Sequence, residues 1–66
     1  MKRDIILVGD IVEPLFGYYN AGFTGTVIKI VDDQSCIVRF TSEKVKHKVQ
    51  LRTFDKLIKR GRNESL

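Results

Sequence analysis

The residues of this chain best suited to binding chemistry are five basic side chains in its second half: Arg39, Lys44, Lys46, Lys48 and Arg52. The three lysines alternate with apolar residues, so on a β-strand they would form one positively charged face. Such a ribbon of charge suits the phosphates of a nucleic-acid backbone, where counterion release would drive binding. Lysines on an edge strand also protect sheets from aggregation, so a purely structural role stays open.

The charge of the whole chain is divided unevenly between its two halves. Residues 1–33 carry three basic and five acidic residues, a net charge of −2, whereas residues 34–66 carry nine basic and three acidic residues, a net charge of +6. This asymmetry favours a polyanionic partner, either nucleic acid (RNA or DNA) or a nucleoprotein complex. The alternative is a soluble surface that is basic without a specific partner.

Aromatic residues form a second candidate site around two glycines, Gly17 and Gly22. Four rings lie within eight positions: Phe16, Tyr18, Tyr19 and Phe23. Exposed rings on a loop can stack on unpaired bases or contact a protein partner. We predict that Phe16, Tyr18 and Tyr19 make such contacts and that Phe23 joins the core. In the alternative, both phenylalanines close one end of the fold and only the tyrosines are exposed.

The titratable residues contain no recognisable catalytic or metal-binding set. His47 and Cys36 are the only histidine and cysteine, and one of each cannot complete a four-ligand zinc site. The alternation places both on an apolar face, where each is best explained as a core residue. We therefore predict a protein that is not an enzyme and has no cofactor and no metal.

A β-hairpin organises the middle of the chain. Two runs rich in β-branched residues, 24–31 and 35–40, flank a polar turn at residues 32–34. Val27, Ile28 and Ile30 cannot all share one face of a regular strand, which indicates a bulged or strongly coiled strand. In the second run, Cys36, Val38 and Phe40 share one face.

Residues 44–51 show the clearest alternation and predict a half-buried strand with one basic face. With Ser42 and Glu43 as the turn, Phe40 would lie opposite Val45, Val38 opposite His47, and Cys36 opposite Val49. Val45, His47, Val49 and Leu51 would then face inward. The same register would set Arg39 against Lys46 on the outer face, and like charges directly opposite are destabilising unless an anion binds them.

The remaining segments complete a five-stranded arrangement. A strand at residues 11–13 ends at Pro14, and residues 15–21 form a loop. Residues 52–55 break the alternation and predict a single turn, followed by a short closing strand at residues 56–59. Residues 1–60 make one domain and residues 61–66 a flexible tail.

Length and hydropathy limit the environment of the chain. A chain of 66 residues has a marginal core, and one cysteine allows no internal disulfide, so homo-oligomerisation is plausible. The apolar run at residues 5–8 is shorter than the core of a secretory signal. No run reaches the length of a membrane-spanning helix, so we expect a cytoplasmic protein without a membrane partner.

Three short motifs resemble the KOW and related SH3-like barrels. They are Gly-Asp-Ile-Val at residues 9–12, Gly-Phe-Thr-Gly-Thr-Val at residues 22–27, and Ile30 followed by Ile-Val-Arg-Phe at residues 37–40. The resemblance covers about residues 5–59 and implies an all-β, five-stranded SH3-like barrel of the KOW or Tudor type. Many KOW domains bind RNA, ribosomes or RNA polymerase, so it also implies binding to a ribonucleoprotein or transcription machine.

We therefore predict a small non-enzymatic module that binds nucleic acid through its basic strand face. The alternative is a protein-interaction adaptor or accessory subunit that uses the aromatic loop at residues 16–23. A remote alternative comes from Val49-Gln50-Leu51, which is similar to a segment of the plasmid-type dihydrofolate reductases, enzymes that work as oligomeric barrels. Arg52 stands where that segment has a tyrosine.

Overall fold

The computed structural model describes residues 5–61, which form one antiparallel sheet of five strands and a single turn of 3-10 helix. The strands are β1 (Ile11–Pro14), β2 (Gly25–Ile30), β3 (Ser35–Phe40), β4 (Val49–Thr53) and β5 (Leu57–Gly61), and the 3-10 helix η1 (Phe54–Lys56) joins β4 to β5. The predicted all-β class is confirmed. A single turn precedes the last strand as predicted, but it begins at Phe54 and not at residue 52, because residues 52 and 53 continue β4.

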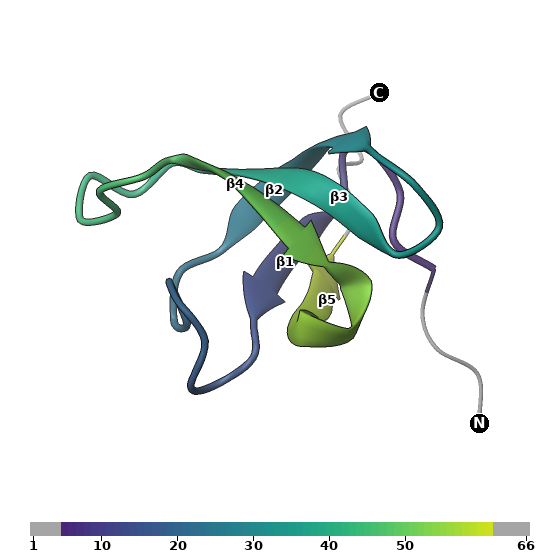
Figure 1. Ribbon diagram of the computed structural model, residues 1–66. Coiled ribbons are helices and arrows are strands. Elements are labelled where there is room, and N and C mark those ends of the chain that lie inside the picture. Colours follow the sequence, from purple (N-terminus) through teal and green to yellow (C-terminus); the bar gives the residue numbers. More distant parts are fainter. Residues whose placement is uncertain (1–4, 62–66) are drawn as a thin grey trace.

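The strands follow the order β4-β3-β2-β1-β5 across the sheet, so β4 and β5 are its two edges. One apolar core nevertheless draws on both halves of this order, with Val12 from β1, Val38 from β3 and Leu57 from β5. The sheet must therefore bend strongly for these side chains to meet. In Figure 1, β2, β3 and β4 pass across the upper part of the view, with β1 and β5 below them.

The predicted β2–β3 hairpin is confirmed, including its irregular first strand. Val27 pairs with Val38 and Lys29 with Ile37, which leaves Ile28 as the extra residue of a bulge. Cys36, Val38 and Phe40 are fully buried, as their shared face predicts. The bulge does not bury all three apolar residues of β2, because Val27 is buried while Ile28 and Ile30 are 44% and 37% exposed.

The predicted strand at residues 44–51 is wrong in its first half. Residues 41–48 form a loop, and β4 begins at Val49. Arg39 pairs with Val49, Val38 with Gln50, and Cys36 with Arg52. This register differs from the prediction by three positions, and an odd shift moves every side chain of the strand to the opposite face. Arg39 therefore does not face Lys46, and the expected repulsion between them is absent.

The shift decides which residues of this region are buried. Val49 and Leu51, predicted to face inward, are 57% and 64% exposed, and His47 is exposed instead of lying on an apolar face. Val45 is buried as predicted, but it reaches the core from the loop. The loop closes where the Phe40 N–H donates to the Lys48 carbonyl oxygen at 2.6 Å.

Strand β5 follows η1 and pairs with β1, Pro14 lying opposite Leu57. It continues to Gly61, two residues beyond the predicted closing strand. Residues 62–66 of the predicted tail lie outside the described residues.

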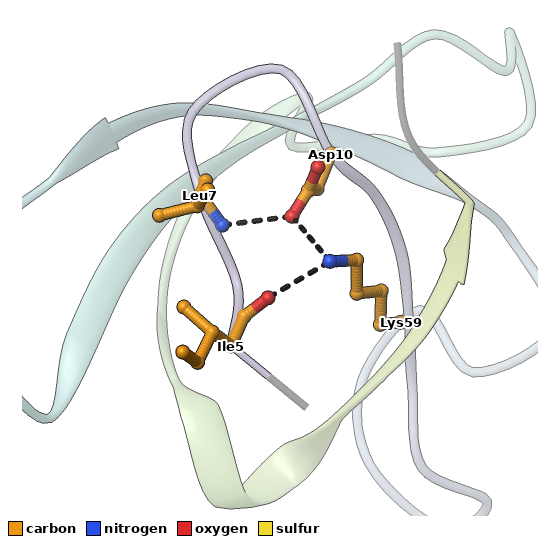
Figure 2. A network of polar contacts seen from close by, with 4 residues as sticks. All are labelled: Ile5, Leu7, Asp10 and Lys59. Carbon is orange, nitrogen blue, oxygen red and sulfur yellow. Dashed lines mark hydrogen bonds and ion pairs between the residues drawn. The ribbon is translucent and has the colours of Figure 1, made fainter. Parts of the chain in front are cut away.

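A buried ion pair fastens the segment before β1 to β5 (Figure 2). The Asp10 carboxylate lies 3.2 Å from the Lys59 ammonium, and Asp10 is 2% exposed. The Leu7 N–H donates to the same carboxylate oxygen at 2.8 Å, and Lys59 also donates to the Ile5 carbonyl oxygen at 2.9 Å. A buried carboxylate with both an ammonium and an amide donor is well satisfied, so this network serves the fold.

Candidate functional site

The two segments singled out in the sequence leave the sheet side by side. Gly25 at the start of β2 pairs with Phe40 at the end of β3. Residues 15–24 precede Gly25 and include the predicted aromatic site at residues 16–23; we call this whole segment the aromatic loop. Residues 41–48 follow Phe40 and carry three lysines; we call them the basic loop. Both project from the same side of the sheet, at the left of Figure 1.

Tyr19 joins the aromatic loop to β4 and to the basic loop. The Arg52 Nη2 donates to the Tyr19 carbonyl oxygen at 2.9 Å, and the guanidinium carbon lies 5.7 Å from the centre of the Tyr19 ring. The same ring is tilted by 43° against the His47 ring, with 6.3 Å between their centres. Tyr19 is still 50% exposed. Its ring therefore contacts two nitrogen-rich side chains while keeping half of its surface available.

A second pair of this kind lies next to it. The Lys56 ammonium is 5.3 Å from the centre of the Tyr18 ring, within the range of a cation–π contact, and Tyr18 is 44% exposed. The Leu15 N–H donates to the Lys56 carbonyl oxygen at 2.9 Å, so the loop is also held to η1 through the backbone. We call Tyr18, Tyr19, His47, Arg52 and Lys56 the basic–aromatic surface.

Three left-handed residues shape the aromatic loop. Gly17, Asn20 and Gly22 have φ values of 95°, 67° and 94°. A Cβ at Gly17 or Gly22 would meet nothing within 4 Å, so backbone conformation, and not lack of space, favours glycine there. These turns present Tyr18 and Tyr19 to the face of the loop that meets β4 and η1.

Arg52 reaches the surface from the face of β4 that carries Gln50 and opposes Cys36. Its Nε is buried and has no hydrogen-bond partner, while Nη2 is held by Tyr19. A guanidinium held in this way against an aromatic ring is well suited to stacking and to phosphate contacts.

The other predicted basic residues are not members of this surface and have different roles. Arg39 is exposed on β3, and Lys44 and Lys46 are exposed on the basic loop. Lys48 donates to the carbonyl oxygens of Ser42 and Val45, each at 3.0 Å. The predicted stripe on two adjacent strands therefore does not exist, and Lys48 is occupied in holding the loop together.

Phe16 does not join the two tyrosines. It is 99% exposed and borders a separate shallow hollow of about 460 Å³, which is also lined by Pro14, Ile58 and Arg60. Phe23 is partly buried and packs against the core, as predicted. The structure thus divides the predicted aromatic site into a tyrosine pair beside cations and an isolated phenylalanine.

His47 and Lys56 are the members of the surface that sequence reasoning missed. Its alternation with valines predicts His47 in the core, although its neighbours Lys46 and Lys48 are a signal of exposure. Nothing in the sequence links Lys56 to Tyr18, because the contact depends on how η1 meets the aromatic loop.

Two further titratable groups, Asp32 and Cys36, have roles in the fold. The pKa of the Asp32 carboxyl is lowered by the Gln34 N–H, the Ser35 hydroxyl and the Ser35 N–H, which close the β2–β3 turn. Cys36 is buried in the core as predicted, and this burial raises the pKa of its thiol. Within residues 5–61 no three His, Cys, Asp or Glu side chains gather as metal ligands would.

In the same range, no helix is long and apolar enough to cross a membrane. Compared with known proteins, the chain matches no family model, no curated protein and no solved structure.

Proposed function

We propose that this protein is a small non-enzymatic module that binds single-stranded nucleic acid through the basic–aromatic surface. The observation that carries the proposal is the contact of Tyr19 with both Arg52 and His47, which unites the aromatic and basic loops. Proteins that bind single strands combine cations for the backbone with exposed rings on which bases stack. Tyr18 and Tyr19 are the rings, and Arg52 and Lys56 are the cations beside them.

The basic loop extends this surface for the backbone of the strand. Exposed Lys44 and Lys46 add positive charge on the same loop as His47. Arg39 lies opposite Val49, on the other face of the β3–β4 pair from Arg52, and is therefore not part of this surface. Because the two tyrosine rings are available only to unpaired bases, we expect a single strand to bind more tightly than a duplex. RNA and DNA share this chemistry, and comparison of the two identifies the preferred sugar.

The fold that we propose for this module is an SH3-like barrel of the KOW or Tudor type. The strand order, the bent sheet and the 3-10 turn between β4 and β5 support that assignment. Nucleic-acid binding agrees with what this resemblance implies, namely a partner such as RNA or a ribonucleoprotein.

The test is a titration of labelled single-stranded and duplex oligonucleotides, in RNA and DNA forms, followed by fluorescence anisotropy at several salt concentrations. Tyr19→Ala should weaken single-strand binding about tenfold, since stacking is worth about 1–3 kcal/mol per base. Lys29→Ala is the matched control for charge: Lys29 is exposed on β2 opposite Ile37, away from both loops, and its removal should leave affinity nearly unchanged.

Absence of binding at low salt, or equal losses for Tyr19→Ala and Lys29→Ala, would contradict the proposal. A melting temperature of Tyr19→Ala close to that of the wild type shows that the loss is one of contact and not of folding.

A second function, that of a protein-interaction adaptor, is favoured by Phe16 alone. A ring that is 99% exposed beside a hollow lined by Pro14 and Ile58 suits an apolar protein contact. Phe16→Ala separates the two functions, because it removes this contact and leaves the basic–aromatic surface intact. Capture of a nuclease-resistant protein partner by the wild type but not by Phe16→Ala would support the adaptor.

A further inference from the structure

The free edge of β4 differs from the other edge of the sheet. β4 reads Val-Gln-Leu-Arg-Thr, and its two apolar side chains, Val49 and Leu51, are more than half exposed. At the opposite edge, β5 carries Arg60, an exposed charge of the kind that discourages strands from pairing across molecules, while Lys59 is held by Asp10. Within β4 itself only Arg52 is charged, and its side chain is held against Tyr19.

The backbone of β4 shows which groups its edge presents. The Phe40 N–H donates to the Lys48 carbonyl oxygen, so these two residues form a hydrogen-bonded pair of the β3–β4 ladder. Hydrogen-bonded pairs alternate along an antiparallel ladder, so Gln50 and Arg52 direct their backbone groups toward β3. Val49, Leu51 and Thr53 therefore direct theirs outward, and within residues 5–61 no backbone partner for them is found.

We propose that a second copy of this chain pairs antiparallel with β4, in a two-fold symmetric register centred on Leu51. In this register Leu51 pairs with Leu51 of the second copy. Val49 of each copy pairs with Thr53 of the other. All outward groups of the strand are then satisfied. Centring on Val49 would run the pairing into the basic loop, and centring on Thr53 would run it into η1, so each would lose pairs.

The side chains fit a second copy in the same register. On one face of the paired strands, Leu51 of each copy contacts Leu51 of the other. Because Ile37 lies beside Leu51 within each chain, the four side chains form one apolar row that runs across the interface and is partly covered by it. On the other face Arg52 lies opposite Gln50, and no two like charges are directly opposed. A small domain with a marginal core gains stability from such association.

This inference does not depend on the proposed function, and the two are distinguished by the opposite effects that added salt should have on dimerisation and on nucleic-acid binding. Each copy carries a net charge of +4, so added salt reduces repulsion between copies and strengthens the dimer. Added salt weakens nucleic-acid binding.

The first experiment measures the mass of the wild-type protein by sedimentation over a wide concentration range. We expect a monomer–dimer equilibrium that Leu51→Lys weakens at least about tenfold, because it sets two ammonium groups opposite each other and removes the central apolar contact. Val8→Lys changes a similarly exposed apolar residue in the segment before β1 and should leave the equilibrium unchanged. Circular dichroism checks that both variants remain folded.

The second experiment tests the register. Cα atoms of a hydrogen-bonded antiparallel pair lie about 5.5 Å apart, within disulfide range. Leu51→Cys should therefore cross-link on mild oxidation, whereas Val8→Cys should not, and native Cys36 is buried. Amide exchange at Leu51 should slow as protein concentration rises, while exchange at Gln50 should not change. A wild-type monomer at millimolar concentration, or a dimer in which Leu51→Cys fails to cross-link, would overturn the proposal.

Discussion

Lys59 and Arg52 are both cations that reach across the molecule, but they end in opposite surroundings. Lys59 meets the buried Asp10 carboxylate and the Ile5 carbonyl oxygen (Figure 2). Arg52 meets a backbone carbonyl oxygen and the face of a half-exposed ring. The first arrangement neutralises charge inside the fold and ties two segments together. The second holds a cation beside an accessible aromatic surface. A cation that stabilises the fold and a cation that is accessible at the surface therefore differ in their position and in their partners, and not in residue type.

Removal of the Asp10 carboxylate should have the largest effect. Asp10→Ala removes the carboxylate that neutralises the Lys59 ammonium and accepts from the Leu7 N–H, and leaves Lys59 with the Ile5 carbonyl oxygen, in a site from which water is largely excluded. We expect a loss of about 3 kcal/mol in the free energy of unfolding, measured by urea denaturation. That is a large share of the stability of a domain of this size.

The matched control is Glu13→Ala, which breaks the more exposed Glu13–Arg60 pair, where Nε and Oε1 are 3.0 Å apart. It should cost less than about 1 kcal/mol. Equal losses of unfolding free energy for Asp10→Ala and Glu13→Ala would mean that burial does not make the Asp10–Lys59 pair the more stabilising of the two.

A smaller effect should separate two lysines of the basic loop. Lys48→Ala removes the donor to the Ser42 and Val45 carbonyl oxygens and should lower the free energy of unfolding by about 1 kcal/mol. Lys46→Ala removes only an exposed charge and should leave stability unchanged. It should instead reduce the salt dependence of the proposed nucleic-acid binding by about one phosphate contact.

Thermal unfolding and a salt titration of each variant measure these two quantities. If Lys46→Ala lowered stability as much as Lys48→Ala, the division between a loop-holding lysine and a ligand-facing lysine would be wrong.

The smallest effect concerns acid pH and the β2–β3 turn. The pKa of Asp32 is lowered in the folded state by amide and hydroxyl donors, so the carboxylate binds protons more weakly when folded than when unfolded. Its contribution is present above the unfolded pKa and is lost as the pH falls through the folded pKa. Asp32→Asn should therefore lower the melting temperature at neutral pH, and the difference from wild type should shrink below about pH 4. A difference that grew as the pH fell would contradict this assignment.

Local pattern was enough to predict much of the sheet. The turn at residues 32–34, the bulge in β2 and the buried row of Cys36, Val38 and Phe40 all follow from alternation and turn chemistry within a short stretch. The single turn before β5 follows from the break in alternation after Leu51. In each case the decisive interactions are between residues close in sequence, which is why the pattern is informative.

Alternation could not decide the register of β4. Residues 44–51 alternate throughout, so the pattern shows which of them would share a face of a strand. It does not show which residue of β3 each one opposes, or whether the connection to β3 is short or long. The longer loop is selected by contacts within it: Lys48 binds two carbonyl oxygens and Val45 reaches the core. Because the resulting shift is odd, Val49 and Leu51 turn outward, and the proposed dimer edge exists only for that reason.

The sequence by itself determined the class of fold, the buried row of Cys36, Val38 and Phe40, and the presence of both basic and aromatic side chains. Only the tertiary structure decided which of them meet. Tyr19 and Arg52 are 33 positions apart, and their contact requires the β2–β3 and β3–β4 pairings to bring the aromatic loop against β4. A surface built from segments so distant in the chain depends on long-range strand pairing, and no local pattern encodes it.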